Sequence, residues 1–143
     1  MPVMSNQSRQ LVNVDFNSCT SNLQDIRVQV RAAAEIAGCQ EDLVQKLVLV
    51  VDEAIANVIR HGYKGSNCGD IRLCISQHDD SLCFELFDWA ATVDPGCIKP
   101  RDLSECRPGG LGINFIDTIM DSWEFKHPPE GEGNVLVMNK KIS

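Results

Sequence analysis

Residues 47–59 read LVLVVDEAIANVI, a stretch that is apolar on nearly every side yet carries two polar groups in its middle. The helix-forming residues 53–56 and the length of the run favour a helix over a buried strand. In a helix, Glu53 and Asn57 share one face a turn apart, and His61 extends the row by another turn. A carboxylate and an amide inside a buried helix are costly unless a partner satisfies them, so the row predicts a binding site.

The length, composition and net charge of the chain exclude several classes of protein. Its 143 residues fit a single domain, residues 1–143, and 43% hydrophobic content is ordinary for a globular protein. The net charge of −7 argues against a nucleic-acid-binding surface. No apolar run approaches the roughly 20 residues that cross a bilayer, and residues 1–10 lack the apolar stretch of a signal peptide. We therefore expect a cytoplasmic protein that binds neither membrane nor nucleic acid.

The cysteines favour a reducing compartment. There are seven of them, an odd number, and no pair has the CxxC spacing of a zinc or redox site. Small buried hydrophobic residues are the favoured interpretation, against a disulfide framework or a metal centre.

The rest of the chain alternates between strand and helix patterns. Ser21 and Gln24 match a capping box, which predicts the start of a helix that stops at Gly38. The region 89–108 has three prolines and little periodicity, and reads as a long loop. The predicted elements are a strand at 11–16, helices at 21–37 and 41–60, strands at 70–77 and 82–88, a helix at 112–121, and strands at 122–126 and 134–140. This order predicts an α+β fold, a two-layer sandwich with a largely antiparallel sheet.

Three features carry candidate chemistry, and each has a plainer alternative. Asn57 offers the hard oxygen that Mg²⁺ prefers, and Glu53 could accept a proton from a hydroxyl attacking a phosphate. By spacing alone, the two could equally be polar residues at a helix–solvent boundary. Asp88 ends a predicted strand, where its carboxylate could accept a hydrogen bond from an exocyclic amine such as that of adenine, or simply cap a loop.

The third feature is the run Arg107-Pro108-Gly109-Gly110-Leu111-Gly112 before a predicted helix. Glycines there allow close backbone approach, and a helix N-terminus attracts phosphates. Arg107 could add a positive charge near a terminal phosphate. The run is neither a Walker A loop nor a Rossmann turn, and glycine-rich turns into helices are common.

Taken in this order, the three features resemble the GHKL ATPases, and within them the small anti-sigma-factor serine-protein kinases of bacterial partner-switching systems. Residues 52–63, DEAIANVIRHGY, resemble the N box of that family. Residues 88–95 occupy the place of its G1 box, and residues 109–121 look like its G2 box and following helix.

The resemblance implies the Bergerat fold, which binds ATP with Mg²⁺ under a lid. It implies that Glu53 is the catalytic base, that Asn57 is the Mg²⁺ ligand, and that Asp88 binds the adenine amine. Gly109, Gly110, Leu111 and Gly112 would lie at the phosphates, with Arg107 at the γ-phosphate. It further implies two protein partners, a sequestered sigma factor and a phosphorylated anti-sigma-factor antagonist, and frequent homodimers.

One departure from the family pattern concerns Ala90, which stands where the G1 box usually has glycine. A methyl group there could crowd the adenine. The alternative function is therefore a protein-binding regulatory module, with or without bound nucleotide, that has no kinase activity.

Overall fold

The computed structural model describes residues 8–64, 69–90, 114–126 and 133–142. Five strands and two long helices make up most of this part of the chain, and residues 114–119 add a short helix. Their bounds are β1 Ser8–Asn17, η1 Thr20–Asn22, α1 Leu23–Ile36, α2 Glu41–Asn57, η2 Val58–Gly62, β2 Asp70–His78, β3 Ser81–Asp88, β4 Ser122–Lys126 and β5 Asn134–Lys141.

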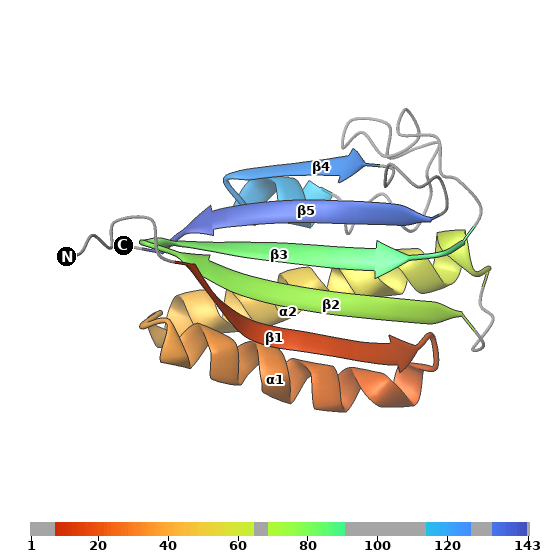
Figure 1. Ribbon diagram of the computed structural model, residues 1–143, viewed down its shortest axis with the longest axis horizontal. Helices are drawn as coiled ribbons and strands as arrows, with labels where there is room; N and C mark the ends of the chain where they lie inside the picture. Colours follow the sequence, from red (N-terminus) through yellow and green to blue (C-terminus); the bar gives the residue numbers. More distant parts are fainter. Residues whose placement is uncertain (1–7, 65–68, 91–113, 127–132, 143) are drawn as a thin grey trace.

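The strands form one sheet in the order β1-β2-β3-β5-β4, and every pairing is antiparallel. Figure 1 shows α1, α2 and the short helix 114–119 on one side of this sheet. The protein is thus an α+β two-layer sandwich with an antiparallel sheet, which confirms the predicted fold class.

The core lies between the helices and the sheet because each element turns one apolar row inward. β3 alternates strictly, with Leu82, Phe84 and Leu86 buried and their neighbours only half-buried. α2 contributes six buried residues spaced at helical intervals: Val44, Leu47, Val50, Val51, Ala54 and Ile55. This packing holds α2 in place against the middle of the sheet, together with the polar residues that it carries.

Two details of the helices differ from the predictions. Ser21 does not cap α1, because its hydroxyl contacts Cys19 Sγ at 3.1 Å and a short 3₁₀ turn, η1, precedes the helix. Asn22, the residue before α1, instead donates from its side chain to Asn17, 2.7 Å from that side-chain oxygen. α2 ends at Asn57 rather than at residue 60, since residues 58–62 widen into the π-helical turn η2.

The described cysteines agree only in part with the sequence interpretation, because Cys74 is buried whereas Cys19, Cys39 and Cys83 are partly exposed. Cys19, Cys39, Cys74 and Cys83 are free thiols. None of the helices in the described ranges is long and apolar enough to span a membrane.

Candidate functional site

Asn57, the last residue of α2, carries the strongest sign of a missing partner. Both polar atoms of its side chain, Oδ1 and Nδ2, are buried and have no hydrogen-bond partner among the described residues. An unpaired buried amide costs about 1–3 kcal/mol per group. The amide oxygen is a hard donor of the kind that Mg²⁺ accepts, so the chemistry of this position fits a bound magnesium ion.

Glu53 lies one turn before Asn57 on α2 and is half-buried. Its carboxylate accepts no hydrogen bond from the described residues, whereas the carboxylate of its neighbour Asp52 is held by Arg27 of α1. That pair is bidentate, with Arg27 Nε 2.9 Å from Oδ1 and Nη2 3.0 Å from Oδ2 of Asp52. Asp52 therefore ties the two helices together, and Glu53 is left as the carboxylate able to take a proton.

Asp88, the last residue of β3, is a buried carboxylate with only 6% of its surface exposed. Its Oδ1 accepts hydrogen bonds from the Ala90 backbone N–H and from Asn134 Nδ2, each at 3.0 Å. Burial raises the pKa of Asp88, and these two hydrogen bonds act in the opposite direction. The second oxygen, Oδ2, accepts no bond from the described residues, so the group keeps an acceptor for a ligand.

Asn134 is a site residue that the sequence interpretation missed. The register of β3 and β5 places it directly opposite Asp88, and its own exposure is 2%. Its side-chain oxygen Oδ1 is buried without a hydrogen-bond partner among the described residues. Only the pairing of two strands that are far apart in sequence brings these residues together. In the sequence, the one available signal was a polar residue at the start of an apolar strand pattern.

The preceding residue, Gly133, lets the two strands approach. Its φ is +91°, and a Cβ on it would lie 2.5 Å from the Asp88 carbonyl oxygen. A side chain is excluded by both constraints, so glycine is required at this point beside the buried carboxylate.

The turn η2, which follows α2, lies beside Ala90 and Asp88. A Cβ on Gly62 would lie 3.0 Å from Ala90 Cβ and 4.0 Å from Asp88 Oδ1. Ala90 is 9% exposed, and its methyl group thus packs over the glycine of η2.

Tyr63 fixes this junction from the other side. Its hydroxyl donates to the Asp70 carbonyl oxygen at 2.7 Å and accepts from the Trp89 backbone N–H at 2.8 Å. One side chain therefore ties η2 to the start of β2 and to the end of β3.

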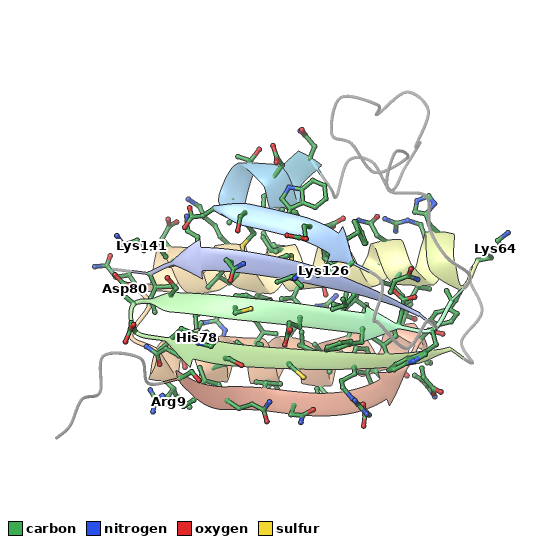
Figure 2. All side chains as sticks on the ribbon, turned by 45° about the horizontal axis from the view of Figure 1, so that its top comes forward. Arg9, Lys64, His78, Asp80, Lys126 and Lys141 are labelled. Carbon is green, nitrogen blue, oxygen red and sulfur yellow. The ribbon has the colours of Figure 1, made fainter. Side chains whose placement is uncertain are left out.

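Figure 1 shows the end of α2, the tip of β3 and the start of β5 at one end of the molecule. In Figure 2, Lys64 marks that end, while His78, Asp80 and Lys141 lie at the opposite end. The structure thus brings together the element ends that carry Asn57, Asp88 and Ala90, and adds Asn134. Arg107, Gly109, Gly110, Leu111 and Gly112 lie outside the described residues.

Comparison with known proteins agrees with this geometry. Residues 16–140 match the family described as the histidine kinase-like ATPase domain. The chain belongs to this family. Figure 1 accordingly shows the layered arrangement of a histidine kinase-like ATPase domain, with its α2 helix against the sheet.

The relatives of this histidine kinase-like ATPase domain are named as kinases. The serine-protein kinase RsbW of Listeria monocytogenes is 30% identical over 125 residues, which cover 82% of this chain and 78% of that protein. The serine-protein kinase RsbW of Bacillus cereus is 27% identical over 125 residues, covering 82% of this chain and 76% of that protein. The predicted family, the serine-protein kinases of the histidine kinase-like superfamily, is confirmed.

A solved structure shows the same fold. It is the SiaB–SiaC complex from Pseudomonas aeruginosa, whose matching chain superposes with a TM-score of 0.63 at 15% identity, covering 92% of this chain and 90% of that one. At this identity, the likeness supports the architecture of the domain.

Proposed function

We propose that this chain is an ATP-dependent serine/threonine-protein kinase that also acts as an anti-sigma factor. In this proposal it sequesters a sigma factor and phosphorylates an anti-sigma-factor antagonist, as part of a partner-switching system. The names of the relatives and the family match support the kinase half of the proposal. The observation that carries it in the structure is the buried amide of Asn57, one turn from the carboxylate of Glu53, neither of which has a hydrogen-bond partner in the described part of the chain.

The residues of α2 would divide the chemistry between them. Asn57 would hold Mg²⁺ through its amide oxygen, and Glu53 would accept the proton of the attacking serine or threonine hydroxyl. When bound, Mg²⁺ neutralises charge on the triphosphate. The ion pair between Asp52 and Arg27 fixes the helix from which both side chains project.

The end of β3, where Asp88 lies, would bind the base. Asp88 supplies a buried acceptor for the exocyclic amine of adenine, and its orientation is fixed by the N–H groups of Ala90 and Asn134. The run 107–112 would hold the phosphates, with Gly109, Gly110, Leu111 and Gly112 offering backbone N–H groups and Arg107 a positive charge.

The proposal extends to partners and location. The two protein partners would be the sigma factor and its antagonist, with a homodimer as the assembly, and no contact with nucleic acid or membrane is expected. An acidic chain with a net charge of −7 suits protein partners better than nucleic acid. Use of ATP with such partners would be expected in the cytoplasm, which is the location that we propose.

The alternative is a protein-binding module without kinase activity, and Ala90 is the residue that favours it. Its methyl group packs over Gly62, and the experiment below distinguishes the module from the kinase.

Phosphate transfer from labelled ATP to the antagonist encoded nearest to this gene tests the proposal. Wild-type protein with Mg²⁺ should label the antagonist, and Glu53→Gln should reduce the rate by at least about a hundredfold. Glu85→Gln is the matched control, since Glu85 lies on β3 within the sheet and is only half-buried. Equal rates for Glu53→Gln and wild type would exclude Glu53 as the base, and no transfer by wild type would favour the module.

A further inference from the structure

The lysines and arginines of the described ranges differ in whether a partner holds them. Arg9 donates to Gln77. The side chains of Arg60, Lys64 and Lys126 make no ion pair or hydrogen bond with any other described residue. The remaining six form ion pairs with carboxylates: Arg27, Arg31, Lys46, Arg72, Lys140 and Lys141.

Two of the cations without a described partner lie close together in the sequence and beside the candidate site. Arg60 lies in η2, Lys64 lies two residues beyond the end of η2, and both are exposed. A Cβ on Gly62, between them, would lie 4.0 Å from Asp88 Oδ1. Figure 2 shows Lys64 pointing outward at this end of the molecule. The two cations therefore lie at the edge of the proposed nucleotide site.

The helix dipole accounts for one of these cations and leaves the other unexplained. A positive charge in the last turn of a helix is favourable whatever the function, and this covers Arg60. Lys64 lies beyond the helix with a φ of +55°, in the left-handed region where a side chain strains the backbone. Glycine would adopt this conformation without strain, so the fold alone gives no reason for a lysine there.

The charge of this pair contrasts with that of the whole chain. With a net charge of −7, the protein as a whole repels an acidic partner. Among the residues that the structure describes, no carboxylate pairs with Arg60 or Lys64, not even the exposed Asp70 at the start of β2. An acidic group that approaches the site at this edge would thus meet two cations that these carboxylates leave unneutralised.

We propose that Arg60 and Lys64 form a docking patch for an acidic segment of the protein substrate, next to the hydroxyl that receives the phosphate. This inference rests on the proposed kinase function and names the chemistry by which that substrate is recognised. Exposed ion pairs add little affinity each, but they guide association and fix how two surfaces align. Acidic side chains beside the accepting serine or threonine would therefore distinguish the substrate from other proteins.

Phosphate transfer to the antagonist encoded nearest to this gene, measured over a range of antagonist and ATP concentrations, tests the inference. The double variant Arg60→Gln, Lys64→Gln should raise the KM for the antagonist about three- to tenfold at low salt, with kcat and the KM for ATP unchanged. Added salt should raise the wild-type KM for the antagonist toward that of the variant, because ions screen exposed charges.

Lys64→Gly separates docking from folding. Because glycine relieves the left-handed strain at this position, the variant should unfold at the same temperature as wild type or at a higher one. Its KM for the antagonist should nevertheless rise about two- to threefold, since one of the two charges is lost. A wild-type KM in this variant would overturn the role of Lys64 in docking.

The double variant Lys126→Gln, Lys141→Gln is the matched control. It removes the same number of charges, but Lys126 lies on β4 and Lys141 lies at the end of the molecule opposite Lys64. Its KM for the antagonist should equal that of wild type, and thermal unfolding checks that each variant is folded.

The other outcomes overturn the inference in distinguishable ways. If wild type labels the antagonist and the Arg60 and Lys64 double variant keeps the same KM and salt dependence, the inference is overturned while the proposed function stands. A rise in the KM for ATP alone would assign the two cations to the nucleotide, and would overturn the docking patch as well. If folded wild type transfers no phosphate, the inference and the proposed function are both overturned.

Discussion

Gly62 and Ala90 pack as a complementary pair, in which a methyl group on one side faces the absence of a side chain on the other. A Cβ on residue 62 would lie 3.0 Å from Ala90 Cβ, closer than two carbon atoms approach without strain. The pair joins η2, which continues the helix of Glu53 and Asn57, to the end of the strand that carries Asp88. The departure from the G1 pattern at position 90 is therefore accommodated by the residue packed against it.

Gly62→Ala should lower the free energy of unfolding by about 1–3 kcal/mol, the usual cost of overpacking. Adding Ala90→Gly should recover most of the loss, because the two methyl groups no longer compete. Gly38→Ala is the control: Gly38 has φ +95° and open space around it, so its loss comes from the backbone and Ala90→Gly should not rescue it. Additive effects of the Gly62 and Ala90 changes in urea titrations would contradict direct contact.

Asp88→Asn should separate stability from binding. Burial raises the pKa of Asp88, so its charged form is disfavoured in the folded state. The stability linked to its protonation is present below the ordinary carboxyl pKa of about 4 and is lost as the pH rises through the raised value. At neutral pH, the variant should unfold at the same or a higher temperature, while its affinity for ADP falls at least tenfold.

Asp121→Asn provides the opposite case for comparison. The backbone N–H of Lys141 lowers the pKa of Asp121, so its contribution is present at neutral pH and is lost as the pH falls through the lowered value. This variant should lose stability at neutral pH without losing ADP binding. A loss of stability in Asp88→Asn as large as that in Asp121→Asn would show that the buried carboxylate serves the fold rather than the ligand.

Asn57→Leu should stabilise the protein without ligand by about 1–3 kcal/mol, since it removes two buried atoms that have no hydrogen-bond partner within the ranges that the structure describes. In wild type, chelation of Mg²⁺ should weaken ADP binding, and in the variant the affinity should be low and insensitive to chelator. Asn139→Leu serves as control and should retain the dependence on Mg²⁺. Calorimetry with and without chelator measures both effects, and an unchanged response of Asn57→Leu would remove Asn57 as the metal ligand.

The fold could be predicted from the sequence because the core helices and strands have clear local patterns of apolar and polar residues. β3 alternates along its whole length, and α2 combines buried spacing with helix-forming residues, so their bounds fall close to the predicted ones. The predicted cap at Ser21 was wrong because a capping motif also depends on the backbone angles. The Ser21 hydroxyl contacts Cys19 Sγ instead of a helical N–H.

The site was harder to predict where it depends on contacts between distant segments. The polar pair in α2 stands out within an apolar helix, but Asn134 gains its role only from the register that places it opposite Asp88. The widening of the helix into η2 also has no local signature, and it sets Gly62 against Ala90.

Tyr63→Phe should loosen the end of β3 where Asp88 lies. The hydroxyl bridges the Asp70 carbonyl and the Trp89 N–H, so its removal should cost about 1–3 kcal/mol and weaken ADP binding severalfold. Burial is the largest cause of the raised pKa of Tyr63. The stability linked to its neutral form is present below the ordinary pKa of about 10 and is lost as the pH rises through the raised value.

Because Tyr63 is the single tyrosine of the chain, phenolate absorbance during an alkaline titration reports this residue alone. Wild type should titrate above the value of the unfolded chain, and its unfolding free energy should fall over that range, while Tyr63→Phe shows no such fall. A phenol that ionises at the same pH in folded and unfolded protein would mean that the Tyr63 side chain is not buried at this junction in solution.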